Sequence, residues 1–275
     1  MGIFSSAGVG KSTLLSMLAR HSETDAIVIG LIGERGREVR EFIEHNLGKE
    51  GLSKSVIIAA TSDRPALERV NAAQTATTIA EGFRAHGQNV LLLIDSVTRY
   101  ARALREIGLS VGEPPSRRGY PPSVFAELPK LLERSGNNET GSITAFYTVL
   151  EEDEDSSDPV AEEVNSILDG HIVLSRQVAE SGQYPPIDIL PSTSRLFRTI
   201  TSETHGENAQ KLRNLLSTYK ENELLLSMGE YKSGSDPLMD LAIKNKHLID
   251  QLLGQTPDEF FPMETTLSLL QEVLD

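Results

Sequence analysis

A short segment near the N-terminus combines glycine, lysine and serine at a spacing that suits phosphate binding. Residues 5–12 read SSAGVGKS, between the apolar residues 2–4 and a helical pattern over residues 12–20. Backbone N–H groups of such a loop can surround phosphate oxygens, and the following helix adds its positive end. This spacing predicts that Lys11 contacts the β- and γ-phosphates and that the Ser12 hydroxyl ligates Mg²⁺.

Glycine at positions 8 and 10 lets the backbone of this loop adopt conformations that a Cβ atom would obstruct. Ser5 departs from the full pattern, G-x-x-x-x-G-K-[ST], which has glycine at that position. The alternative for the segment alone is a glycine-rich turn without a ligand. We expect a site for a nucleoside triphosphate lined by Gly8, Val9, Gly10, Lys11, Ser12 and Thr13.

Two acidic residues follow apolar strand patterns and complete a possible hydrolytic site. Asp95 ends the run VLLLID, where its carboxylate can hold Mg²⁺ through water. Glu34 follows the apolar stretch over residues 26–33, at the sheet edge where α/β proteins bind ligands. It is therefore a candidate to orient or deprotonate an attacking water. For Glu34 taken alone, a capping or ion-paired structural role is the alternative, and many strands end in aspartate.

The first two-thirds of the chain alternates apolar runs with helical patterns. This rhythm predicts an α/β fold with a mostly parallel central sheet and right-handed crossovers. The runs are almost continuously apolar, as in strands covered on both faces. Expected strands are 26–31, 55–59, 90–94, 143–149 and 171–174, and expected helices are 12–20, 37–47, 65–85, 97–107 and 122–133.

Beyond about residue 200 the strand patterns stop. Amphipathic patterns predict helices over 208–228, 236–253 and 265–274. We therefore expect an α/β domain that contains the phosphate site over residues 1–203 and a small α-helical domain over 204–275. Residues 108–122 and the acidic run 151–158 read as loops, the latter as a solvated surface segment.

Composition excludes several classes of site and partner. The chain has 275 residues and no cysteine, so thiol chemistry and disulfides are absent, and its six histidines lack ligand-like spacing. A net charge of −14 and the absence of tryptophan argue against nucleic acid as a partner. No apolar run approaches the roughly 20 residues that cross a bilayer.

Seven segments in order give the chain a specific resemblance to the type III secretion ATPases. The flagellar export ATPase is a close relative in this comparison, and the catalytic subunit of the rotary ATP synthases is a more distant one. The likeness covers nearly the whole chain and loosens after about residue 200. The segments are LIGERGREVREF (31–42), ATSDRPALERV (60–70), LLIDSVTRYARALREI (92–107), GYPPSVFAELPKLLERSG (119–136), GSITAFYTVL (141–150), LDGHIVLSR (168–176) and YPPIDILPSTSR (184–195).

The resemblance implies a RecA-like P-loop fold and an Mg²⁺-dependent ATP hydrolase. It makes Glu34 the residue that activates water, and it places Arg35 and Arg99 near the γ-phosphate. It assigns Glu38 to the waters around Mg²⁺ and Tyr184 to stacking on adenine. Tyr231 is a weaker candidate for the other side of the base.

The resemblance also makes Arg195 an arginine finger that reaches the ATP of an adjacent subunit. Such a residue stabilises transition-state charge and can contribute roughly 10³–10⁵ in rate. Catalysis would then require a ring, usually of six subunits. Without the resemblance, Arg195 reads as a surface ion-pair residue, and Asn165 departs from the arginine of many relatives.

Further expectations come from the same resemblance. Partners would be the central stalk and stator proteins of the export apparatus and chaperone–effector complexes. The location would be cytoplasmic, at the inner face of the bacterial cell membrane, peripheral and not inserted. Relatives carry an N-terminal β-barrel before the phosphate loop, so we expect this chain to be a fragment without it that can be monomeric.

Three other interpretations remain open at this stage. A flagellar export ATPase shares almost every segment quoted. A Rho-like RNA-dependent motor shares the core, although the net charge and the GERGRE segment argue against it. A nucleotide-binding regulatory subunit without hydrolysis is a third, although such subunits often lack the carboxylate that Glu34 supplies.

Overall fold

A computed structural model describes residues 1–151 and 158–274 of the chain. Most of the acidic run at 151–158, expected to be a surface loop, therefore lies outside the described residues. The chain forms two compact units, Met1–Leu174 and Ser175–Asp275. No helix among the described residues is long and apolar enough to cross a membrane.

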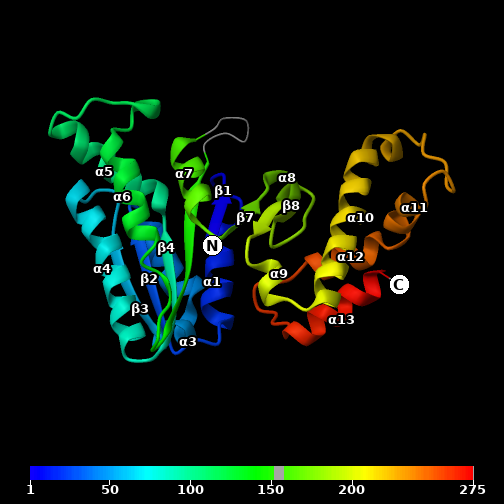
Figure 1. Cartoon of the computed structure of the whole chain (residues 1–275), viewed down its shortest axis with the longest axis horizontal. Helices are drawn as coiled ribbons and strands as arrows, with labels where there is room; N and C mark the ends of the chain where they lie inside the picture. The colour runs from blue at the N-terminus through cyan, green and yellow to red at the C-terminus, as the bar shows by residue number, and fades with distance from the viewer. Residues whose placement is uncertain (152–157, 275) are drawn as a thin grey trace. The chain divides into compact units, whose positions relative to one another are not determined.

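The first unit is built on a twisted sheet whose central strands are parallel (Figure 1). Within this unit the strands lie in the order β3-β2-β4-β6-β1-β7, and the short β5 pairs antiparallel with β6. The strands are β1 (Gly2–Ser5), β2 (Ala26–Ile32), β3 (Ser55–Ala60), β4 (Asn89–Asp95), β5 (Gly136–Asn137), β6 (Ser142–Leu150) and β7 (Gly170–Leu174). The predicted mostly parallel sheet is confirmed, as are its five apolar strands.

Helices cover both faces of this sheet, which explains why its strands are continuously apolar. Helices α4, α5 and α6 lie on one face, and α1 and α3 lie on the other (Figure 1). The helices are α1 (Lys11–His21), α2 (Gly36–Glu41), the π-helix η1 (Phe42–Asn46), α3 (Gly48–Ser53), α4 (Ala66–Ala85), α5 (Val97–Ser110), the 3₁₀ turn η2 (Arg117–Gly119), α6 (Pro122–Leu132) and α7 (Pro159–Ile167).

The helix predicted over residues 37–47 is divided in two. Helix α2 gives way to the π-helix η1, in which Leu47 N donates to Phe42 O at 2.8 Å, five residues back. This wider turn brings residues five apart onto one side, and both Phe42 and Leu47 are buried. Helix α7 was not predicted; it begins after Asp158, whose carboxylate accepts from Val160 N and Ala161 N.

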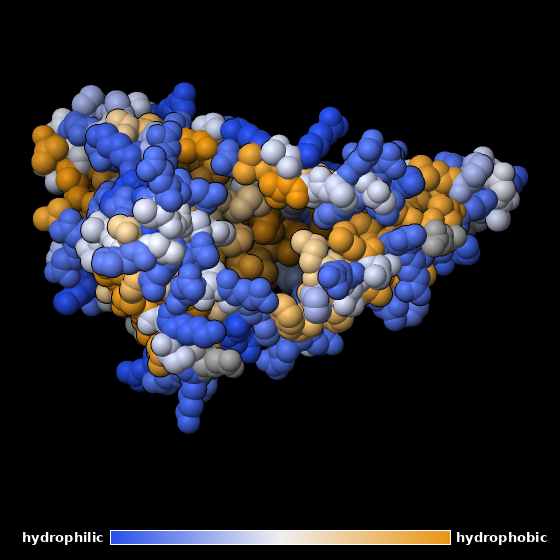
Figure 2. Space-filling view, turned by 60° about the horizontal axis from the view of Figure 1, so that its bottom comes forward, coloured by the Kyte–Doolittle hydropathy of each residue, from blue (hydrophilic) through white to orange (hydrophobic). Residues whose placement is uncertain are grey.

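The second unit contains one strand and several helices. They are α8 (Arg176–Glu180), β8 (Ile187–Ser194), α9 (Phe197–Ile200), α10 (Glu203–Ser227), α11 (Pro237–Lys244), α12 (Lys246–Leu253) and α13 (Met263–Leu274). A small apolar core joins the last helices, with Leu212, Ile249, Leu270 and Val273 buried. The helical part of this unit also carries apolar residues at its surface (Figure 2).

The prediction of a single helix over residues 236–253 is wrong. Helix α11 ends at Lys244 and α12 begins at Lys246, so only Asn245 separates them. The Asn245 amide is buried and donates to Val273 O at 2.8 Å, so the break is tied to the packing of α13. From the end of the strand patterns we expected a domain boundary between residues 203 and 204. The structure forms two compact units that divide earlier in the chain, after Leu174.

The centre of the first unit gives a stability prediction. Leu92 lies in β4 between two helix layers and has no exposed surface. Leu92→Ala should lower the free energy of unfolding by about 2–5 kcal/mol in urea titrations, because it leaves a cavity in close-packed surroundings. Leu67→Ala is the matched control, since Leu67 on α4 is 61% exposed. Equal losses in the two variants would contradict the assigned core.

Candidate active site

The phosphate loop connects β1 to α1 in a backbone conformation that depends on glycine. Gly8 and Gly10 have φ values of 80° and 107°, in the left-handed region. Helix α1 begins at Lys11, so its positive end faces the loop, and no acidic residue in its first turn offsets that charge. Ser5, where the pattern has glycine, is buried at the end of β1, and its Oγ has no hydrogen-bond partner among the described residues.

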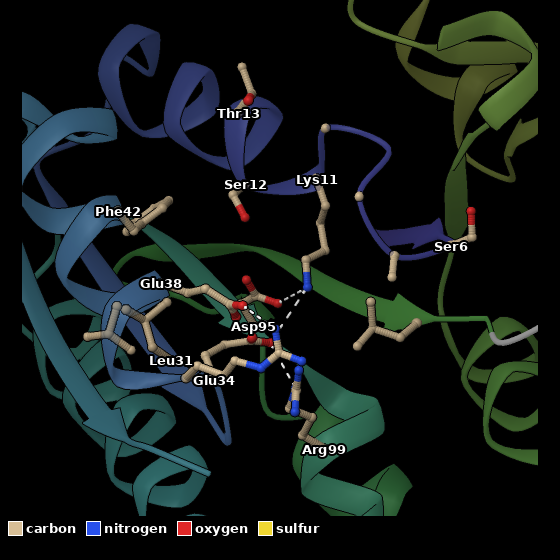
Figure 3. A pocket seen from close by; sticks show the side chains of 16 residues that line it. Ser6, Lys11, Ser12, Thr13, Leu31, Glu34, Glu38, Phe42, Asp95 and Arg99 are labelled. Atoms are coloured by element: carbon tan, nitrogen blue, oxygen red, sulfur yellow. Dashed lines mark hydrogen bonds and ion pairs between the residues drawn. The ribbon is translucent and has the colours of Figure 1, made fainter. Parts of the chain in front are cut away.

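A cavity of about 340 Å³ opens beside this loop (Figure 3). Side chains from the ends of β2 and β4 and from α2 form its other walls. The Ser12 hydroxyl points toward the carboxylates, and Thr13 lies farther from them on α1 (Figure 3). The lining residues that the sequence predicted are Gly8, Gly10, Lys11, Ser12, Thr13, Glu34, Arg35, Glu38, Asp95 and Arg99. Val9, in the loop, is buried and does not line the cavity.

Sheet topology brings the acidic residues together. Strands β2 and β4 are parallel neighbours, with Leu31 paired to Asp95, so Glu34 and Asp95 leave the sheet at the same edge. Strand β6 separates β4 from β1, which leads into the loop. The Lys11 side chain therefore crosses the end of β6 to reach the carboxylates.

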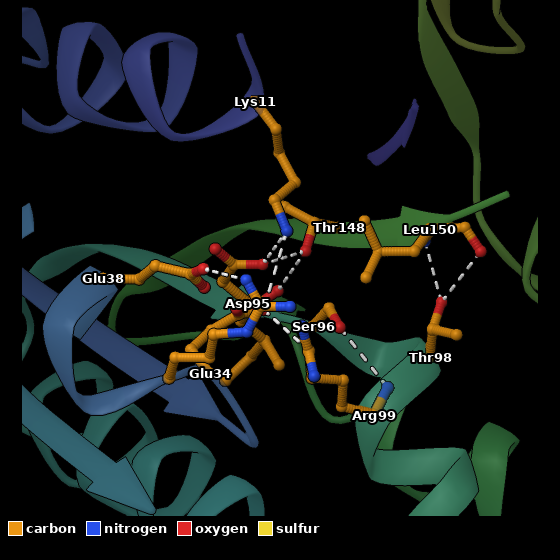
Figure 4. A network of polar contacts seen from close by, with 11 residues as sticks. Lys11, Glu34, Glu38, Asp95, Ser96, Thr98, Arg99, Thr148 and Leu150 are labelled. Carbon is orange, nitrogen blue, oxygen red and sulfur yellow. Dashed lines mark hydrogen bonds and ion pairs between the residues drawn. The ribbon is translucent and has the colours of Figure 1, made fainter. Parts of the chain in front are cut away.

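The charged side chains form one connected network (Figure 4). Lys11 Nζ lies 2.6 Å from Asp95 Oδ1 and 3.7 Å from Glu34 Oε1. Arg99 Nε donates to the same Glu34 oxygen at 3.0 Å. Because Glu34 and Asp95 are almost completely buried, these cations offset much of the cost of removing two carboxylates from water.

Burial, and after it the negative charge of Asp95, raise the pKa of Glu34 to about 7 against the opposing charges of Lys11 and Arg99. The Glu38 carboxyl behaves differently. Burial opposes its ionisation, but the hydrogen bond with Glu34 and the nearby Arg35 guanidinium lower its pKa below the usual value. Of the two carboxyls, Glu34 is therefore the one that titrates near neutral pH, which suits a general base.

Arg35 extends away from the buried network. Its NH1 donates to Glu38 Oε1 at 3.1 Å, and the Arg35 side chain is 62% exposed. An exposed pair of this kind contributes little stability. The geometry leaves Arg35 able to move toward a ligand in the cavity, whereas Arg99 is held on Glu34.

The residues present fit a magnesium ion bound together with a triphosphate. Ser12, Asp95 and Glu38 offer a hydroxyl and two carboxylates on one side of the cavity. Among the described residues there is no cluster of three or more His, Cys, Asp or Glu that could bind a metal by protein ligands alone. Mg²⁺ commonly binds through one or two protein oxygens, waters and substrate phosphates, as this donor set would require.

Gly33 precedes Glu34 and lets Arg99 approach the backbone. Its φ is +70°, and its N–H donates to Ala60 O at 2.6 Å. A Cβ atom at position 33 would lie 3.0 Å from Arg99 Cδ and 3.1 Å from Arg99 Cβ. The absence of a side chain thus makes room for the aliphatic part of Arg99, whose guanidinium contacts Glu34.

Sequence reasoning missed two threonines of the site. Thr148 in β6 is fully buried, and its hydroxyl donates to Asp95 Oδ1 at 2.7 Å. Thr98 on α5 accepts from Leu150 N at 2.8 Å, which fastens the end of β6 beside the cavity. For Thr148, the sequence signal that could have indicated a site residue was a hydroxyl near the carboxyl end of an otherwise apolar strand pattern.

Other predicted site residues belong to the second unit. Tyr184 is 52% exposed, and Arg195 lies in the turn after β8. The Tyr231 hydroxyl donates to Asp236 O and Asp240 Oδ1 within the helical part of that unit. Their roles toward adenine and toward a neighbouring nucleotide stay predictions.

Two protein-family models match the chain, one over each part. Residues 1–194 match the model of the ATP synthase alpha/beta family, nucleotide-binding domain. Residues 201–272 match the model of the T3SS EscN ATPase C-terminal domain.

Individual relatives are similar along the entire chain. A type 3 secretion system ATPase of Xanthomonas euvesicatoria is 58% identical over 275 residues, which are 100% of this chain and 62% of the relative. A flagellum-specific ATP synthase of Bacillus subtilis (strain 168) is 54% identical over 270 residues, 98% of this chain and 62% of the relative. The chain thus spans about three-fifths of the length of these relatives.

Solved structures agree with the fold. The assembled ATPase EscN from the enteropathogenic E. coli type III secretion system matches with a TM-score of 0.95 and 53% identity, over 100% of this chain and 66% of that chain. The same ATPase in complex with its central stalk EscO matches with a TM-score of 0.94 and 52% identity, over the same shares.

The network makes the titration of Glu34 a direct test of the site. By ¹³C NMR of the carboxyl carbon, Glu34 should titrate with a midpoint of about 7 in the nucleotide-free chain. Asp95→Asn should lower this pKa because a negative charge is lost, and Arg99→Gln should raise it because a positive charge is lost. The signal is identified by its absence in Glu34→Gln. A midpoint near the usual value of 4.5 would contradict the burial and pairing described.

Proposed function

The chain belongs to the ATP synthase alpha/beta nucleotide-binding family, and from this we propose that it hydrolyses ATP to energise type III protein secretion. The C-terminal match to secretion ATPases and the identity to such a protein along the whole chain support this choice within the family. The observation that carries the catalytic part is a buried carboxyl with a pKa of about 7 beside a phosphate loop.

Binding begins at the loop. Backbone N–H groups and the start of α1 surround the phosphates, and Lys11 exchanges its contact with Asp95 for the β- and γ-phosphate oxygens. Ser12, Asp95 and Glu38 would hold Mg²⁺, which neutralises phosphate charge when bound. Tyr184 would stack on the adenine ring.

Hydrolysis then depends on Glu34. In its ionised form Glu34 accepts a proton from the water that attacks the γ-phosphate. Arg99 holds the carboxylate in place through its Nε, and Thr148 orients Asp95 on the other side. Arg35, which is exposed and paired only with Glu38 among the contacts described, would turn toward the γ-phosphate.

Assembly and partners follow from the similar proteins. EscN has been solved in assembled form and in complex with a central stalk, so we propose a ring for the protein that contains this chain. In a ring of six, Arg195 would reach the nucleotide of the adjacent subunit. Stator proteins, chaperone–effector complexes and a position in the cytoplasm at the inner face of the cell membrane belong to the same proposal.

Replacement of Glu34 tests the catalytic assignment. Glu34→Gln should lower kcat by about 10²–10⁴ because the amide cannot accept the proton of water. ATP affinity, measured by calorimetry, should be retained, since Lys11 and the loop are unchanged. In the unmodified chain kcat/KM should rise with pH through about 7, as Glu34 becomes ionised.

The matched control is Glu44→Gln, which neutralises an exposed carboxylate on η1. It should leave turnover and affinity unchanged. Full turnover by Glu34→Gln would exclude Glu34 as the base. Loss of ATP binding in that variant would mean that Glu34 acts in binding, and it would contradict a role in the chemical step alone.

The flagellar interpretation is supported by the 54% identity to the Bacillus subtilis protein. A strain lacking the gene distinguishes the two systems. We expect loss of protein export by the secretion apparatus with motility intact, and complementation should restore export. Loss of motility with intact secretion would reverse the choice.

A further inference from the structure

The second unit contains an arginine that holds the strand leading to Arg195. Arg213 NH1 donates to Ile189 O at 2.6 Å and to Ser192 O at 3.2 Å, and Arg213 NH2 donates to Leu190 O at 2.7 Å. All three acceptors are main-chain carbonyls of β8. A planar guanidinium fixes several acceptors at once because its N–H groups form a rigid fork.

Arg213 itself is presented by a rigid support. It lies on α10, where the adjacent Leu212 and the nearby Leu215 are buried. Leu212 packs in the small core with Ile249 and Leu270. Apolar packing therefore fixes this part of α10, and the hydrogen bonds of the Arg213 guanidinium attach β8 to it.

Strand β8 contains a proline and local side-chain hydrogen bonds where Arg213 contacts it. Pro191 lies between two of the residues held and has no N–H group to donate. The Asp188 carboxylate accepts from Leu190 N, and Ser192 Oγ donates to Asp188 O. A cavity of about 1240 Å³ also lies against this strand, α9 and α10, so dense packing does not hold the segment by itself.

Arg195 lies between two attachments to α10. On one side Arg213 holds Ser192, three residues before Arg195. On the other side the Phe197 ring contacts the His205 ring edge to face, with centroids 5.3 Å apart. The exposed turn that carries Arg195 is thus fastened to the same helix before and after it.

From this arrangement we propose that Arg213 is a positioning residue that sets the place of Arg195 in the reaction. The proposal rests on the proposed function, in which Arg195 acts on the nucleotide of an adjacent subunit. A catalytic cation must be placed closely, because a displacement of about 1 Å can cost on the order of 10²-fold in rate. Release of β8 therefore slows the chemical step and leaves ATP binding at Lys11 unaffected.

The test compares single and double variants at protein concentrations where light scattering shows assembly. Arg195→Ala and Arg213→Ala should each lower kcat, the latter by about tenfold or more, with an unchanged dissociation constant for ATP. The double variant should be no slower than Arg195→Ala, since Arg213 acts only through Arg195. Arg213→Lys should be intermediate because an ammonium group reaches fewer of the three carbonyls.

Lys220→Ala is the matched control. It removes an exposed ion pair between α10 and the start of β8, Lys220 to Asp188 at 3.3 Å, and it should leave kcat unchanged. If Arg213→Ala does not fold, the same comparison can be made with Arg213→Lys, measured alone and in combination with Arg195→Ala.

Two results overturn the proposal in distinguishable ways. If Arg213→Ala lowers kcat by the same factor in the Arg195→Ala background as in the unmodified chain, Arg213 does not act through Arg195, and only the positioning role fails. If Arg195→Ala itself turns over at the normal rate in the assembled state, the finger assignment fails and the positioning role with it, while hydrolysis by the Glu34 site stands.

Discussion

The site depends on the burial of two carboxylates at adjacent strand ends. Glu34 and Asp95 are both almost fully buried, and like charges so close together would repel strongly in a poorly solvated region. Lys11 and Arg99 offset this repulsion, Lys11 from the start of α1 and Arg99 from α5. The sheet must therefore keep β1, β4 and β2 in register, because Lys11 follows β1, Asp95 ends β4 and Glu34 follows β2.

This balance also assigns different roles to the carboxyls. Burial and the charge of Asp95 keep the proton on Glu34 near neutral pH, whereas Glu38 stays ionised beside Arg35. One carboxyl can then exchange a proton while the other offers a fixed negative charge. Environment, not residue type, separates the two functions.

The sequence predicted most of the first unit because its signals are local. Apolar runs such as 90–94 are too regular to be loops, and the loop at residues 5–12 has a pattern with a known physical purpose. Residues at the carboxyl ends of parallel strands meet at one edge, so Glu34 and Asp95 could be expected together before any coordinates.

Other features depend on tertiary contacts that no local pattern reveals. The hydroxyl of Thr148 matters only because β6 lies beside β4, and the break at Asn245 only because its amide meets Val273 on a distant helix. The π-helix that begins at Phe42 is likewise a result of packing. The finger role of Arg195 comes from resemblance alone, since residues of a neighbouring subunit leave no pattern in one chain.

Gly33 shows how a residue with no side chain can affect the ionisation of a neighbouring carboxyl through a third residue, Arg99. A Cβ atom there would crowd the aliphatic part of Arg99, which would have to shift by a few tenths of an ångström and so weaken the contact of its guanidinium with Glu34. With that positive charge withdrawn, the carboxyl would hold its proton to higher pH. The size of the residue at position 33 therefore sets the pH at which Glu34 ionises, without the replacement of any side chain that lines the cavity.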